Sequence, residues 1–195
     1  MLSITERQNL KTLDIDLKNG AEIARLINNE DKRVALAVAK IIPQIGDAID
    51  KIADSLAKGG RMAYFGCGTS GRLGILDASE LQPTFGLSPK IVQAYIAGGE
   101  QAIRHAVENA EDSELLAEDD FNSFCPQKGD VVVGISASGN PKYLIKIMSL
   151  ARQKGCLTIA ITSNSKAQIN AFADIVLCVS LGAAAIVGSS RMKSG

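Results

Sequence analysis

From residue 61 onward, short apolar runs rich in Val and Ile alternate with stretches of helix-forming residues. The runs are nearly continuously apolar, as in strands that are buried on both faces, and alternation with helices is typical of a parallel sheet with right-handed crossovers. We therefore expect an α/β domain over residues 59–195, built on a five-stranded parallel sheet. The predicted strands cover residues 61–65, 90–97, 129–136, 157–162 and 173–180.

The preceding part of the chain has a helical pattern. Apolar residues recur at spacings of three and four between Val34 and Leu56, which is the spacing of one helix face. Pro43 predicts a break or kink, and Gly59-Gly60 predicts the end of the helix. We expect residues 1–58 to form an N-terminal helical segment that packs on the domain.

Three helices are expected within the domain. The first follows a glycine-rich loop and ends near Gln82, because Pro83 disfavours helix continuation. The second is a single helical stretch over residues 99–120, and the third covers residues 142–155.

Composition argues against several classes of partner. The 21 basic and 21 acidic residues balance and Trp is absent, so nothing indicates a nucleic-acid or membrane partner. The four cysteines are scattered and only His105 could join them, so we expect no metal site. The N-terminus lacks a basic start followed by an apolar run. We therefore expect no signal peptide, reduced thiols and a cytoplasmic location.

Two loops rich in glycine and hydroxyl residues follow the first and third predicted strands. They are Gly66–Gly71, with the sequence GCGTSG, and Ser136–Asn140, with the sequence SASGN. Such loops are often only tight turns and helix caps. Because parallel strands bind ligands at their carboxyl ends, and because small residues expose N–H groups to an anion, the pair favours a phosphate pocket.

Other motifs have less support. GCGTSG fits a dinucleotide fingerprint, but the acidic residue expected after the second strand is missing, and no P-loop is present. His105 lies among helix formers, and Gly-x-Ser-x-Gly is absent. Carboxylates remain as acid/base candidates, but the pattern alone does not choose between the pair at Asp77 and Glu80 and the cluster over residues 108–114.

The run Gly68–Glu80 with Pro83–Gly86, together with the blocks IAGGEQAIRHAVENAEDS, GISASGNP and GSSRMKSG, closely resembles the N-acetylmuramic acid 6-phosphate etherases. Their sugar-phosphate isomerase (SIS) domain has a flavodoxin-like sheet. The resemblance implies cleavage of the D-lactyl ether at C3 of ring-opened N-acetylmuramic acid 6-phosphate in amino sugar and cell-wall recycling. The products are N-acetylglucosamine 6-phosphate and D-lactate, and the reaction needs no metal or organic cofactor.

The same resemblance implies the site residues. Glu80 would donate a proton to the ether oxygen, and Glu111 would be a second acid/base; which one takes the C2 proton stays open. Thr69, Ser70, Ser136 and Ser138 would hold the phosphate, and Gly68, Gly71 and Gly139 would shape the substrate-binding loops.

Helix geometry adds an expectation about Glu80. If a straight helix starts near Ser70, Glu80 lies about 15 Å further along, at about 1.5 Å rise per residue. Sugar C2 and C3 are much closer to their own 6-phosphate than that. We therefore expect a homodimer with shared active sites, in which Glu80 acts on a sugar phosphate held by the other chain.

The chain departs from the etherase pattern in places. Asn140-Pro141-Lys142 replaces Arg-Thr-Pro, Ala184 replaces an acidic residue, and the chain stops where etherases continue, so we expect a truncated member. The alternatives are a non-catalytic regulator that binds sugar phosphates, as in the glucokinase regulatory protein, an inactive fragment, or an SIS isomerase. An isomerase would not need the block from Asp77 to Gly86.

Overall fold

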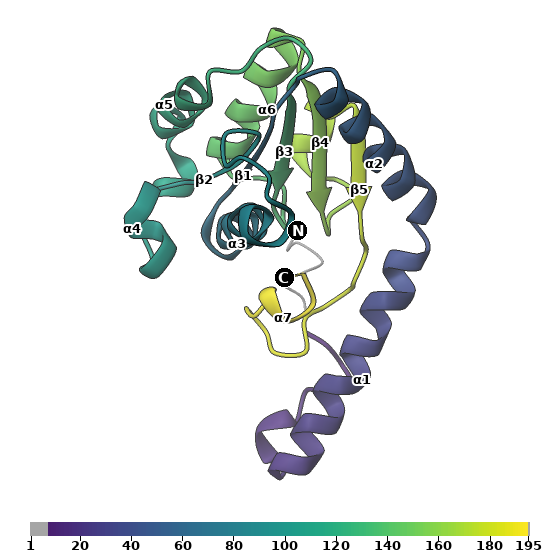
Figure 1. Cartoon of the computed structure of the whole chain (residues 1–195). Helices are drawn as coiled ribbons and strands as arrows, with labels where there is room; N and C mark the ends of the chain where they lie inside the picture. The colour runs from purple at the N-terminus through teal and green to yellow at the C-terminus, as the bar shows by residue number, and fades with distance from the viewer. Residues whose placement is uncertain (1–7, 195) are drawn as a thin grey trace.

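Five strands form one parallel sheet in the computed structural model, which describes residues 8–194. They are β1 (Met62–Gly66), β2 (Val92–Ile96), β3 (Val131–Ile135), β4 (Leu157–Thr162) and β5 (Ile175–Cys178). Their order is β2-β1-β3-β4-β5, which is the flavodoxin-like order (Figure 1). The predicted fold class is confirmed. Residues 1–7 and 195, which the predicted segments included, lie outside the described residues.

Helices cover both faces of the sheet. On one face, α2 (Ile42–Ala57) and α3 (Gly68–Phe85) pack against a core that includes Val133 and Ile159. On the other face, α5 (Glu114–Phe124) and α6 (Lys142–Lys154) enclose the largest buried cluster. The shorter elements are η2 (Ile15–Leu17), α4 (Gly99–Arg104), η3 (Ala110–Asp112), η4 (Gln168–Phe172) and α7 (Arg191–Ser194).

The N-terminal helical segment is confirmed in the described residues. Its two helices are α1 (Gly20–Ala39) and α2, and Pro43 lies in the first turn of α2, where its missing N–H costs nothing. Figure 1 shows α2 beside β5 and α1 projecting beyond the sheet. A domain boundary at residue 58 stays a prediction. Within residues 8–194, no helix combines the length and apolar character needed to cross a bilayer.

The prediction of one helix over residues 99–120 is wrong. The Arg72 guanidinium donates to the carbonyls of Ile103 (2.8 Å) and His105 (3.2 Å), which satisfies the end of α4. Asn109 then adopts a left-handed conformation with φ of 61°, and Ser113 caps the start of α5. The break is a tertiary effect, because the stabilising arginine comes from α3.

The predicted end of α3 near Gln82 is also wrong. The helix continues through Pro83 to Phe85 and stops at Gly86, which is left-handed. Pro83 and Ser79, the residue four positions before it, are both exposed, so water can donate the hydrogen bond that proline cannot donate to the Ser79 carbonyl.

A buried ion pair joins the N-terminal segment to the segment after β5. Lys193 Nζ lies 2.8 Å from Glu30 Oε2, and both side chains are almost completely buried. Arg33 Nη1 lies 3.0 Å from the other carboxylate oxygen. Burial alone would raise the pKa of Glu30, but the hydrogen bonds from Lys193 and Arg33 outweigh it and lower the pKa from 4.5 to about 2.

This shift predicts a loss of stability in acid. Because the folded pKa of Glu30 lies below its unfolded value, the stabilisation is complete above pH 4.5 and disappears as the pH falls toward 2. Glu30→Gln leaves Lys193 as a buried unpaired cation, which at pH 7 should cost about 3–5 kcal/mol of unfolding free energy. Urea denaturation should show the difference between wild type and Glu30→Gln narrowing from pH 5 downward.

The matched control for this prediction is Asp31→Asn. Asp31 is the exposed neighbour of Glu30 on α1, so its variant should stay close to wild type at every pH. A difference between wild type and Glu30→Gln that is the same at pH 7 and pH 3 would contradict the assignment.

Candidate functional site

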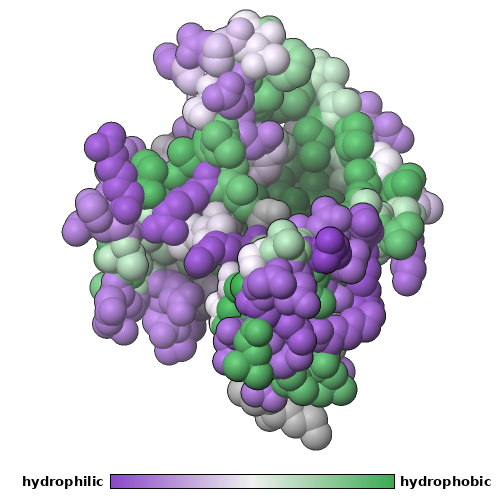
Figure 2. All heavy atoms as spheres, turned by 90° about the horizontal axis from the view of Figure 1, so that it is seen from below, coloured by the Kyte–Doolittle hydropathy of each residue, from purple (hydrophilic) through white to green (hydrophobic). Residues whose placement is uncertain are grey.

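A cavity of about 290 Å³ lies at the carboxyl ends of β1 and β3. The strand order reverses between these two strands, and open α/β sheets bind their ligands at such a point. Figure 2 views the molecule from below and shows a hollow with apolar atoms in its depth. The cavity is lined by Cys67, Thr69, Ser70, Glu111, Ser136, Ala137, Ser138, Pro141, Gly188 and Ser190.

The loop between β1 and α3 supplies one wall. Gly68 has a φ of 53°, a conformation that glycine adopts without strain, and it begins α3 directly after the strand. A Cβ on Gly66 would lie 2.7 Å from the backbone nitrogen of Gly71, so the two backbones meet without a side chain between them. Thr69 and Ser70 follow in the first helical turn, where N–H groups have no partner within the helix.

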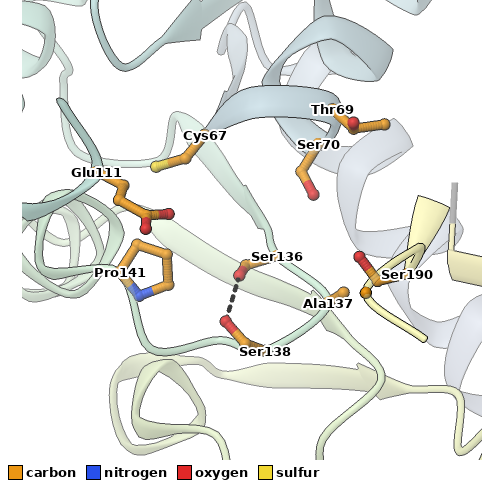
Figure 3. A pocket seen from close by; sticks show the side chains of 10 residues that line it. Cys67, Thr69, Ser70, Glu111, Ser136, Ala137, Ser138, Pro141 and Ser190 are labelled. Carbon is orange, nitrogen blue, oxygen red and sulfur yellow. Dashed lines mark hydrogen bonds between the residues drawn. The ribbon is translucent and has the colours of Figure 1, made fainter. Parts of the chain in front are cut away.

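The loop between β3 and α6 supplies a second wall. The Ser136 hydroxyl accepts a hydrogen bond of 2.9 Å from the Gly139 N–H, which leaves the hydroxyl proton available to a ligand. Ser138 lies 3.4 Å from Ser136, as the dashed line in Figure 3 shows. Gly139 has a φ of 67°, and a Cβ there would collide with Ala167, so this position requires glycine.

Glu111 enters the cavity from η3. In Figure 3 its carboxylate lies beside Pro141 and on the same side of the cavity as Ser138. Cys67 lies next to it; burial, and then the negative charge of Glu111, raises the pKa of this thiol to about 12, so the thiol is neutral. Both residues also line an adjoining cavity of about 350 Å³ that reaches His105. Glu111 therefore lies between two connected spaces.

A third wall, which we define as Gly188–Ser190, comes from the segment after β5. Figure 3 shows the Ser190 hydroxyl pointing toward Ser70, across the cavity from Glu111 and Pro141. No functional role was predicted for this wall from the sequence. Its only signal was the block GSSRMKSG, which carried the family resemblance without a role for any residue.

Other predicted residues lie elsewhere. Glu80 is exposed on α3 and does not line the cavity, so the structure does not bring it together with Glu111. Lys142, one of the three residues that replace Arg-Thr-Pro of the etherases, is exposed and is not among the lining residues. Pro141 does line the cavity, without an N–H or a hydroxyl.

The cavity is suited to an anion through neutral donors. Among residues 8–194, its lining contains hydroxyls, N–H groups at the start of α3 and one carboxylate, but no Lys or Arg. Within residues 8–194, no group of three or more His, Cys, Asp or Glu side chains is placed to hold a metal ion.

Comparison with known proteins gives the family. A model described as the glucokinase regulatory protein N-terminal SIS domain matches residues 44–152, more than half of the chain. The chain belongs to this SIS family. Among solved structures, the SIS fold is shared with phosphoheptose isomerase from Francisella tularensis, at a TM-score of 0.66 and 19% identity over 83% of this chain and 86% of that one. The Vibrio vulnificus NanR protein complexed with ManNAc-6P has a TM-score of 0.63 and 13% identity over 94% and 62%.

The resemblance of this SIS chain to the etherases is also confirmed. It is 47% identical to the N-acetylmuramic acid 6-phosphate etherase of Glaesserella parasuis serovar 5 (strain SH0165) over 192 residues. The match covers 98% of this chain and 63% of that relative. The SIS chain thus spans slightly less than two thirds of the length of this curated relative.

The close packing at the first wall predicts the effect of Gly71→Ala. A Cβ on Gly71 would lie 2.6 Å from Ile96 Cγ1 and 2.8 Å from the Gly66 carbonyl oxygen. The variant should lose about 1–3 kcal/mol of unfolding free energy through overpacking. Gly46→Ala in α2 has nothing within 4 Å and should gain about 0.4–1 kcal/mol. Urea denaturation of both variants checks this, and an unchanged Gly71→Ala would contradict the packing.

Proposed function

We propose that this chain carries the sugar-phosphate site of an N-acetylmuramic acid 6-phosphate etherase. The observation that carries the proposal is the convergence of Glu111 with the hydroxyls of Thr69, Ser70, Ser136 and Ser138 on one cavity. The etherase relative at 47% identity supports the choice of this reaction.

The four hydroxyls would bind the 6-phosphate. Two of them stand in the first turn of α3, where the partial positive charge of an 18-residue helix favours an anion. The other two come from the loop after β3, in which Gly139 fixes the Ser136 oxygen. A phosphorylated amino sugar suits this site, and NanR, which shares the fold, is described in complex with ManNAc-6P.

Glu111 would then be the base that removes the C2 proton. It is the carboxylate that lines the phosphate cavity, and it also borders the adjoining cavity, where the rest of the sugar can extend. Loss of the C2 proton from the open-chain aldehyde allows the C3–O bond to break and D-lactate to leave. Water then adds at C3 and gives N-acetylglucosamine 6-phosphate.

Glu80 would protonate the departing oxygen from a second copy of the chain. The helix from Gly68 to Phe85 is continuous, so about 15 Å separates Glu80 from Ser70. Leu76, one turn before Glu80 on the same face, is 58% exposed, which is apolar surface that a partner subunit would cover. A symmetric dimer would place each Glu80 toward the partner's site.

A second candidate is a regulator that binds sugar phosphates without catalysis. It is favoured by the match to the glucokinase regulatory protein domain and by the position of Glu80 outside the cavity. Both candidates use the same phosphate site and differ in whether the lactyl ether is cleaved.

Release of D-lactate from N-acetylmuramic acid 6-phosphate tests the proposal. The wild-type chain should release lactate, and Glu111→Gln should lower the rate at least about 100-fold, which is the usual contribution of a general base. Binding of N-acetylglucosamine 6-phosphate should persist in this variant, because the phosphate hydroxyls are intact. A coupled assay for D-lactate measures the rate, and calorimetry measures the binding.

Asp112→Asn is the matched control, since Asp112 is the exposed neighbour of Glu111 in η3 and does not line the cavity. It should keep most of the activity. No lactate from wild type, together with a thermal shift on adding the sugar phosphate, would support the regulator instead.

Mixing two inactive variants tests the shared site. Glu80→Gln and Glu111→Gln chains should each be nearly inactive, but their heterodimer has one site in which both glutamates are intact. Roughly a quarter of wild-type activity should return, because half of randomly mixed dimers are heterodimers with one active site of two. Subunits must be exchanged before the lactate assay, and no recovery after verified exchange would rule out sharing.

A further inference from the structure

The third wall belongs to the segment after β5, whose backbone pairing with β4 ends at Val179, where the N–H donates to the Thr162 carbonyl at 2.9 Å. After β5, the chain runs from Val179 through short turns to α7, which has only four residues. Ile186 and Val187, which directly precede the third wall, are 44% and 56% exposed. Ala184 and Ala185 are buried further back in the segment, but Gly188–Ser190 itself has neither a strand partner nor deep apolar burial to hold it.

Polar contacts to the N-terminal segment hold it, together with a 3.1 Å hydrogen bond between the hydroxyls of Ser163, after β4, and Ser194. Lys193 Nζ contacts Glu30 at 2.8 Å and donates to the Ala183 carbonyl at 2.9 Å. The Thr12 hydroxyl donates to the Ala185 carbonyl at 2.6 Å. These contacts fix the chain on both sides of the third wall.

The ion pair is connected directly to the cavity. The Ser190 carbonyl accepts hydrogen bonds from the N–H groups of Lys193 (3.2 Å) and Ser194 (2.9 Å). Ser190 is thus part of the same turn as the lysine, and its hydroxyl faces the cavity (Figure 3). A shift of Lys193 away from Glu30 would move Ser190 with it.

Building on the proposed function, we infer that Ser190 is a further phosphate-binding residue and that the buried Glu30–Lys193 pair positions it. Ser190 supplies a hydroxyl that points toward Ser70, and no cationic side chain of the described residues 8–194 lines the cavity. Glu30 lies on α1, touches no part of the cavity lining and acts only through Lys193. Glu30 is therefore a positioning residue.

Calorimetric titration of the full chain with N-acetylglucosamine 6-phosphate tests the inference. Ser190→Ala should weaken binding about tenfold, as expected for one hydrogen bond to a charged group. Glu30→Gln should weaken it by a similar factor at a temperature where the variant is folded. The double variant Ser190→Ala/Glu30→Gln should bind no more weakly than the weaker single variant, because both changes remove the same contact.

Controls separate positioning from stability. Asp31→Asn should bind like wild type. Combining Glu30→Gln with Lys193→Met leaves no unpaired buried charge, so it should regain part of the melting temperature that Glu30→Gln loses, but not the affinity. If Glu30→Gln alone does not fold, the affinity of this double variant for the sugar phosphate is measured in its place.

Four outcomes would overturn the inference. Normal affinity in folded Glu30→Gln, or equal recovery of affinity and melting temperature in the Glu30→Gln/Lys193→Met variant, would leave the pair with a structural role only. Additive losses from Ser190→Ala and Glu30→Gln would show that the two residues act separately. If the wild type does not bind the sugar phosphate, the proposed function is overturned as well. If the wild type binds it, but Glu30→Gln has normal affinity or the Glu30→Gln/Lys193→Met variant recovers affinity and melting temperature equally, the proposed function stays intact and only the inference is overturned.

Discussion

The close packing of α3 on the end of β1 is the contact on which the site depends. Backbone meets backbone there because Gly66 and Gly71 have no side chains. Further along, the Tyr64 hydroxyl donates a 2.8 Å hydrogen bond to Asp77 and holds the same helix on the sheet. These contacts place the start of α3 at the cavity. They also direct the rest of the helix away from it, which leaves Glu80 on the surface.

Much of the fold could be predicted because its signals are local. Five apolar runs became five parallel strands close to their predicted positions, and the spacing from Val34 to Leu56 became two helices that break before Pro43. The errors arose where contacts with residues distant in the sequence determine the local structure. Nothing near residue 104 indicates that the Arg72 guanidinium will donate hydrogen bonds to the carbonyls at the end of α4. The helix-forming composition therefore predicted one helix that continued to residue 120.

The site residues, too, divide into those that local sequence signals predict and those that depend on distant contacts. The convergence of Ser70 and Ser136 followed from a general rule, because loops at the carboxyl ends of neighbouring parallel strands must meet. Glu111 was known only through the family resemblance, since its position depends on the break after α4. Ser190 was missed because no periodic pattern in the sequence indicates it. Its place depends on the ion pair between Glu30 and Lys193, which are 163 positions apart.

That separation has a consequence for how the protein is made. Chains emerge from the ribosome N-terminal end first, and domains fold as their elements become available. Glu30 emerges long before Lys193, so the sheet and both phosphate loops can form while the carboxylate still lacks its partner. Closing so long a loop carries its own entropic cost. The nascent chain would thus acquire the sheet before the contact that places Ser190, and affinity for ligand would rise only after the sheet has formed.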